Sequence, residues 1–251
     1  IDEVVEGFKF NERGQLIMAC GTGKTYVSLW VKERISAQST LVLVPSLSLL
    51  SQTLREWTFA AKEPFDVMCV CSDKTVVKKS DQDELIESVH DFPFPVTSDI
   101  EEIREFLKRS APKVIFSTYQ SSPLIVESQS NEKAPSFDLA IADEAHRCTG
   151  DTGGKFATVL DDSLIKSKRR LFLTATPRTY ESNLKKRAEE RGVEISGMDE
   201  EAVFGKVFHS LPFGKAIDSG LLTDYQVVIV GVNKPMIYEW IENRELIKTD
   251  S

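Results

Sequence analysis

The sequence predicts an α/β fold in which a mostly parallel central sheet is flanked by helices. Short apolar runs, typical of strands buried on both faces, alternate along the chain with segments whose apolar residues recur at helical spacing. Polar or glycine-containing clusters follow several of these runs directly. Because ligands of parallel α/β sheets bind at the carboxyl ends of the strands, we expect these clusters to form one site.

The first two strand–helix units are the clearest. Residues 14–19 form an apolar run that leads into a glycine-rich turn, and a helix is expected from Lys24 onward. The apolar face of this helix contains Val27, Trp30, Val31 and Ile35. The apolar run 41–44 stops at Pro45, as expected of a buried strand. The helix after it has an apolar face made of Leu47, Leu50, Leu54, Trp57 and Ala61.

The rest of the chain is less regular. Further strands are expected at residues 66–71, 113–117, 137–142 and 170–174. Residues 73–112 interrupt the alternation, and we interpret them as an insertion whose last part opens a helix with a capping box at 98–101. The inward face of that helix contains Ile100, Ile103 and Leu107. We expect residues 1–225 to form one domain, and residues 226–251 to begin, or link to, a second domain that is truncated.

Composition limits the class of protein. Hydrophobic residues make up 41% and charged residues 28% of the 251 residues, which argues against disorder. No apolar run approaches the ~18 residues of a membrane span, and no signal peptide is present, so we expect a cytoplasmic protein without a membrane partner. The chain begins with Ile1 rather than Met and is expected to be a piece of a longer protein.

The four cysteines are too few for a disulfide scaffold at this length. Cys69 and Cys71 would share one face of a strand and could chelate zinc. Because no second Cys or His pair follows at a usable spacing, we expect buried, reduced thiols instead.

The net charge of −8, taken alone, argues against nucleic-acid binding. The charges are unevenly distributed, however, with acids dominating residues 73–112 and Lys and Arg dominating residues 163–191. These basic residues could form a strip that faces DNA or a solvated helix face with ion pairs, and they include Arg169, Arg170, Arg178, Lys185, Lys186 and Arg187.

Residues 19–25, Ala-Cys-Gly-Thr-Gly-Lys-Thr, lie between a predicted strand and a predicted helix, which is the context of a phosphate-binding loop. Glycines let backbone N–H groups approach phosphate oxygens, and the helix N-terminus adds partial positive charge. Lys24 would reach the β- and γ-phosphates, and Thr25 would ligate Mg²⁺. The other nucleotide-binding residues are expected to be Cys20, Gly21, Thr22 and Gly23. Met18 stands where the general pattern has its first glycine.

Asp143-Glu144-Ala145-His146 follows the apolar run 137–142. A carboxylate at the end of a buried strand, with the phosphate loop on a neighbouring strand, is placed to hold Mg²⁺, and we assign this role to Asp143. Glu144 would orient or deprotonate the attacking water. The acids could instead only complement a helix dipole, but the phosphate loop earlier in the chain favours the metal site.

Thr174-Ala175-Thr176-Pro177 follows the run 170–174. Two hydroxyl groups at i and i+2 could bond the acidic motif and relay the nucleotide state. Taken alone, the motif is better interpreted as an ordinary turn that ends a strand.

In this order the three motifs resemble those of the first RecA-like motor domain of superfamily-2 helicases and translocases, over roughly residues 10–180. The resemblance implies a RecA-like P-loop NTPase fold that binds ATP and Mg²⁺, with Lys24, Asp143, Glu144 and His146 as catalytic residues. It also implies that Thr174 and Thr176 couple the nucleotide state to the grip on DNA. It implies that His146 couples the nucleotide to the interface between the two motor domains. Two further segments, 41–52 and 117–121, match those that touch the nucleic-acid backbone, which gives as contacts Pro45, Ser46, Gln52, Thr118 and Gln120. Hydroxyl and amide groups beyond strand ends can bond phosphates without reading base sequence. Each of these residues could instead be an ordinary cap or turn residue.

A closer likeness is to single-polypeptide Type I (Type ISP) restriction–modification enzymes. It rests on residues 18–25, 44–57, 143–150, 174–178 and 208–225. The likeness implies an ATP hydrolase that translocates on double-stranded DNA, with a second RecA-like domain of the same polypeptide as its partner. In that family a nuclease precedes the motor and a methyltransferase follows it, so both are expected in the full-length chain. The arginine that stabilises the transition state normally comes from the second motor domain, so the 251 residues should bind nucleotide but hydrolyse it weakly.

Two alternatives stay open from the sequence. The first is a helicase that separates strands of DNA or RNA. The second is a nucleotide-dependent switch that never moves on nucleic acid.

Overall fold

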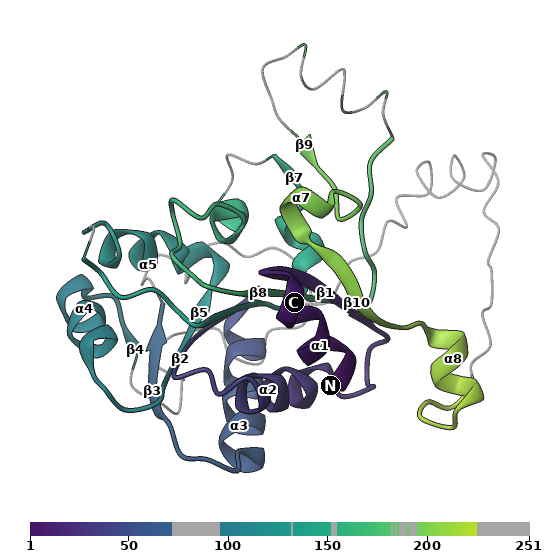
Figure 1. The fold of residues 1–251 in the computed structure, drawn as a ribbon, viewed down its shortest axis with the longest axis horizontal. Coiled ribbons are helices and arrows are strands. Elements are labelled where there is room, and N and C mark those ends of the chain that lie inside the picture. Colours follow the sequence, from purple (N-terminus) through teal and green to yellow (C-terminus); the bar gives the residue numbers. More distant parts are fainter. Residues whose placement is uncertain are drawn as a thin grey trace, which may run out of the picture.

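In a computed structural model of the chain, the described residues are 1–71, 96–131, 133–151, 155–181, 183, 185, 190 and 195–224. Among them, eight strands form one sheet, and every hydrogen-bonded pair of strands in it is parallel (Figure 1). The order across the sheet is β10 (Lys206–Leu211), β1 (Arg13–Met18), β8 (Arg170–Thr174), β6 (Leu139–Ala142), β2 (Ser39–Val44), β5 (Lys113–Thr118), β3 (Asp66–Val70) and β4 (Val96–Thr97). A short antiparallel pair, β7 (Gly150–Asp151) and β9 (Ile195–Ser196), lies outside this sheet.

Helices cover both faces of the sheet (Figure 1). One face carries α1 (Asp2–Phe10), α2 (Lys24–Arg34) and α3 (Leu47–Ala60). The other carries α4 (Ile100–Lys108), α5 (Ser122–Ser128) and α7 (Glu201–Phe204), together with the 3₁₀ helices η3 (Tyr119–Ser121), η4 (Ala145–Cys148) and η5 (Lys155–Leu160). The last described helix is α8 (Phe213–Asp218), which follows β10.

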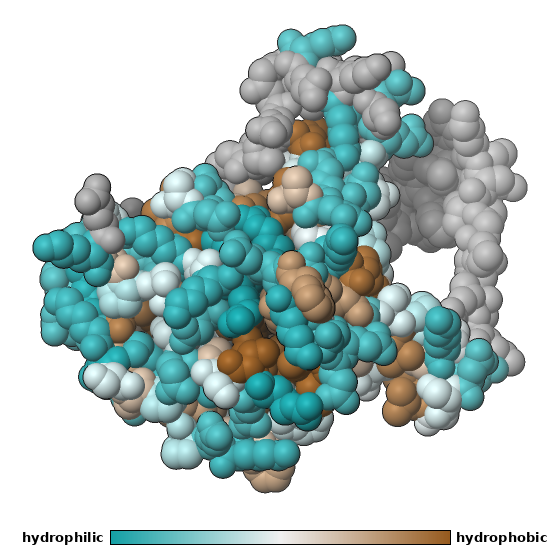
Figure 2. All heavy atoms as spheres, viewed as in Figure 1, coloured by the Kyte–Doolittle hydropathy of each residue, from teal (hydrophilic) through white to brown (hydrophobic). Residues whose placement is uncertain are grey.

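The hydrophobic core has two layers, one on each face, because successive side chains of a strand point to opposite sides. On β2, Val42 and Val44 belong to the layer under α1–α3, whereas Leu41 and Leu43 belong to the layer under α4 and α5. All six residues of β2 are buried, as expected of a central strand of a parallel sheet. The outer surface seen in Figure 2 is mostly hydrophilic, with smaller apolar areas.

The structure confirms the predicted α/β class and the six strands expected from apolar runs, which are β1, β2, β3, β5, β6 and β8. One boundary differs. The helix at residue 100 is capped by Asp99, whose carboxylate accepts from the backbone N–H groups of Glu101 (2.8 Å) and Glu102 (3.3 Å). The predicted capping box at 98–101 is therefore one residue out of register, because Asp99 rather than Ser98 supplies the oxygen that reaches the first turn.

Part of the predicted insertion belongs to the sheet and core. Residues 96–112 supply β4, which pairs with β3, and α4, whose Ile103, Phe106 and Leu107 are buried. The remainder of the insertion, residues 73–95, and the expected start of a second domain at 226–251 lie outside the described residues. Neither α1 nor β10 was expected from the sequence pattern, and β10 adds an outer strand beside β1.

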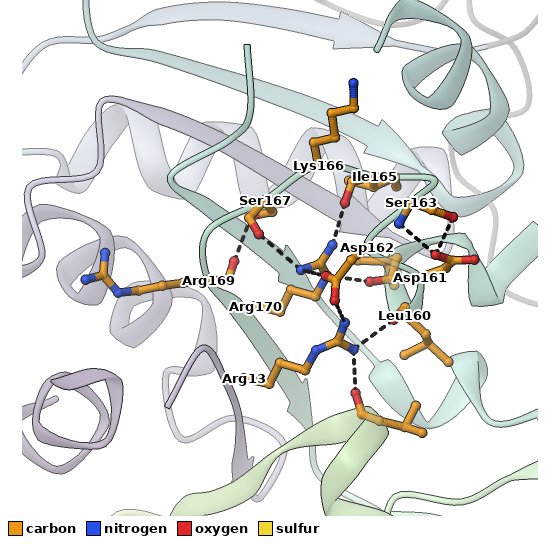
Figure 3. Close-up of polar contacts among 12 residues, drawn as sticks. Arg13, Leu160, Asp161, Asp162, Ser163, Ile165, Lys166, Ser167, Arg169 and Arg170 are labelled. Atoms are coloured by element: carbon orange, nitrogen blue, oxygen red, sulfur yellow. Dashed lines mark hydrogen bonds and ion pairs between the residues drawn. The ribbon is translucent and has the colours of Figure 1, made fainter. Parts of the chain in front are cut away.

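Two arginines hold the end of the sheet at which the strands begin (Figure 3). Arg13 opens β1 and Arg170 opens β8, and both guanidinium groups form ion pairs with Asp162. They also donate to the backbone carbonyl oxygens of Val159, Leu160, Ile165 and Val203. Only 3% of the Arg170 side chain is exposed, so Arg170 does not belong to a strip that faces DNA. Within the part of the chain that the structure describes, no helix combines the length and apolarity needed to cross a membrane.

Candidate nucleotide and coupling site

The phosphate-binding loop occupies the turn between β1 and α2. Gly21 (φ +79°) and Gly23 (φ +87°) have left-handed backbones, which L side chains rarely adopt. Nothing lies within 4 Å of the position that a Cβ of Gly23 would take, so backbone conformation rather than crowding requires glycine there. The Thr22 hydroxyl donates to the carbonyl of Ala19 (2.6 Å), which closes the turn, and Cys20 is exposed at its tip.

Lys24 is the first residue of α2, and its ammonium group turns back across the loop. Nζ donates to the backbone carbonyl oxygens of Met18 (3.1 Å) and, more weakly, Ala19 (3.4 Å). These bonds hold the cation at the mouth of the loop, beside the N-terminus of a helix. Phosphate oxygens can replace the two carbonyl acceptors there, and the helix dipole favours the same anion.

Helix α3 supports the loop from the side. The indole N–H of Trp57 donates to the carbonyl oxygen of Thr25 (3.1 Å), and the Ser28 hydroxyl donates to the same oxygen (2.7 Å). Trp57 is fully buried, so this contact ties the first turn of α2 rigidly to α3. The sequence pattern predicts only that Trp57 lies on an apolar helix face. A buried indole N–H needs a hydrogen-bond partner, and this need is the signal that Trp57 also supports the phosphate loop.

Asp143 directly follows β6 and is the half-buried carboxylate of the site. Its backbone N–H donates to the carbonyl of Leu43 at the end of β2 (2.9 Å). The pKa of Asp143 is raised to about 6, chiefly by burial and also by the charge of Glu144, whereas the backbone N–H of Glu144 and the positive charge of Lys24 act in the opposite direction. The structure therefore brings the loop lysine and the acidic motif within electrostatic reach of each other.

The strand order corrects one detail of the sequence-based picture. The phosphate loop and Asp143 were expected on neighbouring strands, but β8 lies between β1 and β6. Apolar runs in the sequence predict which strands exist, but the order of the strands in the sheet depends on how the chain crosses over between them. The middle position of β8 places Thr174 between the phosphate loop and the acidic motif.

Glu144 and His146 connect the acidic motif to β8. Glu144 has a left-handed backbone (φ +50°, ψ +46°), which is uncommon for a residue with a side chain. Its carboxylate Oε2 lies 3.3 Å from Nδ1 of His146, and the same Nδ1 lies 3.0 Å from the hydroxyl oxygen of Thr174. Burial lowers the pKa of His146, as do Arg178 and Arg147, whereas Glu144 opposes the shift. The imidazole is thus held mainly neutral near pH 7.

Thr174 and Thr176, both predicted to be coupling residues, differ in their contacts. The Thr174 side chain is buried and accepts a hydrogen bond from the backbone N–H of Thr176 (3.1 Å), in addition to its contact with His146. Thr176 is exposed and enters the network through its backbone. A chain of contacts thus runs from Glu144 through His146 to the turn after β8.

The predicted nucleic-acid residues follow the ends of β2 and β5, which are adjacent strands. Ser46 caps α3, its hydroxyl oxygen accepting from the N–H of Leu49 (3.3 Å), and Gln52 is exposed and donates to Glu56 (2.8 Å). Pro45 and Thr118 are buried, and the Thr118 hydroxyl donates to Ser121 (3.0 Å). Gln120 is half-buried, and its Oε1 has no hydrogen-bond partner among the described residues.

The arrangement is compatible with ATP and Mg²⁺. No group of three or more His, Cys, Asp or Glu side chains that could cage a metal occurs among the described residues. Mg²⁺ commonly takes one or two protein oxygens together with phosphate oxygens and water, which the Thr25 hydroxyl and the Asp143 carboxylate can supply. A divalent cation beside Asp143 would also stabilise the charged form of this half-buried carboxylate.

Fold and site together define a RecA-like P-loop domain of the helicase motor class. The chain belongs to the family described as "Type III restriction enzyme, res subunit", which matches residues 1–179.

Similar proteins agree with this placement. The "Probable helicase A859L" of African swine fever virus (isolate Pig/Kenya/KEN-50/1950) is 32% identical over 235 residues, which are 93% of this chain and 23% of the relative. The structure of LlaBIII, an ATP-dependent Type ISP restriction–modification enzyme bound to DNA, is similar with a TM-score of 0.70 and 34% identity over 90% of this chain and 15% of that one. A nuclease-deletion mutant of LlaGI, a Type ISP enzyme in complex with a DNA substrate mimic, gives a TM-score of 0.66 and 31% identity over 99% of this chain and 22% of that one. The chain therefore spans less than a quarter of each, and it is a helicase-family motor domain similar to those of Type ISP enzymes.

Proposed function

We propose that the chain is the first motor domain of an ATP-dependent double-stranded DNA translocase in a restriction–modification enzyme. The observation that carries the proposal is that the phosphate loop, the turn after β8 and the acidic pair follow the carboxyl ends of three neighbouring strands, β1, β8 and β6. Lys24 lies within electrostatic reach of Asp143, and His146 contacts both Glu144 and Thr174. The DNA-bound Type ISP structures support DNA as the track, because they match nearly the whole chain.

Bound ATP would supply the phosphoryl group to be transferred to water, and Mg²⁺ would neutralise charge on its phosphates. In this proposal the loop N–H groups and Lys24 hold the phosphates, while Thr25 and Asp143 hold the metal. Glu144, which faces His146 in this structure, must turn toward the water to orient it or accept its proton. His146 then registers that movement, because it contacts Glu144, and Thr174 registers it through its own contact with the same imidazole nitrogen.

DNA contact is proposed for the ends of β2 and β5. Gln52 is exposed there, and Ser46 and Gln120 are half-buried, whereas Pro45 and Thr118 shape the turns from within. Contacts of this type would hold the phosphate backbone without reading sequence, which suits a motor that must pass over any DNA. The nuclease, the methyltransferase and a second RecA-like domain are proposed for the remainder of a full-length protein.

The test is ATP turnover by the longest natural chain that contains this domain, with double-stranded DNA, single-stranded DNA, RNA or no nucleic acid. Strong stimulation by duplex DNA carrying a specific site is the expected result. Stimulation by single strands or RNA alone would favour a strand-separating helicase, the activity in the name of the viral relatives. No stimulation by any of them would indicate a nucleotide-dependent switch.

A further inference from the structure

Tyr119 is the first residue of η3 and directly precedes Gln120, which is proposed to meet DNA. Its own side chain is fully buried, unlike that of Gln120. The phenol hydroxyl donates to the backbone carbonyl oxygen of Asp143 at 2.7 Å. Since β2 lies between β5 and β6 in the sheet, this bond reaches past the end of β2 to the acidic motif.

The accepting carbonyl belongs to the peptide unit that joins Asp143 to Glu144. Glu144, on the far side of that peptide, has the left-handed backbone described above. A residue with a side chain keeps this conformation only where its surroundings hold it. The Tyr119 hydroxyl therefore fixes the peptide on which the directions of the Asp143 and Glu144 carboxylates both depend.

The Tyr119 ring is packed tightly enough to transmit a movement of η3 to the hydroxyl group. It stacks on Phe156 of η5, with ring centroids 5.1 Å apart and an interplanar angle of 29°. Burial raises the pKa of Tyr119 far above its usual value, and Cys148 at the end of η4 adds to this. The phenol stays protonated, so it remains a hydrogen-bond donor at any working pH.

We propose that Tyr119 is a positioning residue that passes nucleic-acid contact at Gln120 to the Asp143–Glu144 peptide. The inference rests on the proposed function, because DNA contact at this turn is itself part of that proposal. Movement of η3 on binding DNA changes the hydrogen bond to the Asp143 carbonyl. That change shifts Glu144 between its place beside His146 and a place facing the nucleotide. Tyr119 would thus help to make ATP hydrolysis depend on DNA.

The experiment compares the full-length protein with its Tyr119→Phe variant, which keeps the ring and its stacking on Phe156 and removes only the hydroxyl. The readouts are ATP affinity, DNA affinity and the ratio of kcat with duplex DNA to kcat without it. We expect both affinities to stay within about twofold and the ratio to fall about fivefold to tenfold, the effect of losing one buried hydrogen bond. Tyr180→Phe is the matched control. It also removes a phenol hydroxyl, one that lies 3.2 Å from Thr149, and it should leave the ratio unchanged.

A merely structural role would lower the melting temperature and reduce both kcat values in proportion, with the ratio preserved. An unchanged ratio in Tyr119→Phe, beside a parent enzyme that DNA stimulates, overturns the inference and leaves the proposed function standing. A parent enzyme that no nucleic acid stimulates overturns both.

Discussion

Lys24 is the residue on which nucleotide binding depends most. Its ammonium is held over the loop by two backbone carbonyl oxygens, so it is already in place for phosphate. We expect Lys24→Ala to reduce ATP affinity at least about 100-fold, because a charge-assisted contact to a multiply charged ligand is lost. Isothermal titration with ATP and Mg²⁺ measures this. Lys9→Ala is the control, since Lys9 lies on α1 and pairs with Glu6 on the surface. Equal affinities in the two variants would contradict the role of the loop.

Glu144 is expected to act on water rather than on binding. Glu144→Gln keeps the size of the side chain and its place near His146 but removes the negative charge that accepts a proton. In the full-length enzyme we therefore expect ATP affinity near that of the parent and kcat reduced about 10²–10⁴-fold, so that the ATP-bound state accumulates. Single-turnover hydrolysis measures the chemical step directly. Hydrolysis at the parental rate would show that another group handles the water.

At the scale of elements, Asp99 caps α4, the helix that follows the outermost strand β4. Asp99→Ala removes an oxygen that accepts two backbone N–H groups, and it should lower the free energy of unfolding by about 1 kcal/mol. Urea unfolding of the 251-residue chain, followed by circular dichroism, measures the change. Ser98→Ala is the matched control, because Ser98 is exposed and does not cap the helix. A larger loss from Ser98→Ala would restore the register predicted from the sequence.

The elements also show how far sequence patterns reach. Runs such as 41–44 predict strands well, because a strand buried on both faces must be apolar throughout. The order of the strands cannot be predicted in this way, because a crossover connection can pass over one strand or several. No local sequence pattern indicates that β8 lies between β1 and β6. β10 escaped prediction for the opposite reason. It is an edge strand with mostly exposed or half-buried residues, so it has no continuous apolar run.

The candidate site was predictable to the extent that its chemistry is local. The phosphate loop needs glycines and a lysine at fixed spacing, and these are visible in residues 19–25. The contact between His146 and Thr174 joins residues 28 positions apart, and that between Tyr119 and Asp143 joins residues 24 apart. Such contacts depend on packing. The sequence pattern does not single out Tyr119, because its neighbours are polar, although a tyrosine needs a hydrogen-bond partner when it is buried and this need is a usable signal.

At the scale of the whole molecule, the resemblance to two-domain motors predicts that the arginine that stabilises charge in the transition state comes from the second RecA-like domain. An arginine supplied from a partner domain can contribute about 10³–10⁵ in rate. We expect the 251-residue chain to bind ATP with an affinity close to that of a chain extended through the second RecA-like domain, because Lys24, Thr25 and Asp143 are all present. Its kcat should be lower by about 10³ or more.

Steady-state ATP turnover and equilibrium binding, measured side by side on the two chains, separate these effects. The Lys24→Ala variant of each serves as the background, since residual turnover in it comes from contaminating ATPases. If the 251-residue chain hydrolysed ATP as fast as the extended one, the transition-state charge would have to be stabilised from within residues 1–251. The exposed Arg178, which follows the turn after β8, would then be the first side chain to replace, because its charge already reaches His146. If instead the 251-residue chain failed to bind ATP, the phosphate loop would need the second domain in order to bind nucleotide. The nucleotide site would then be shared between the two domains.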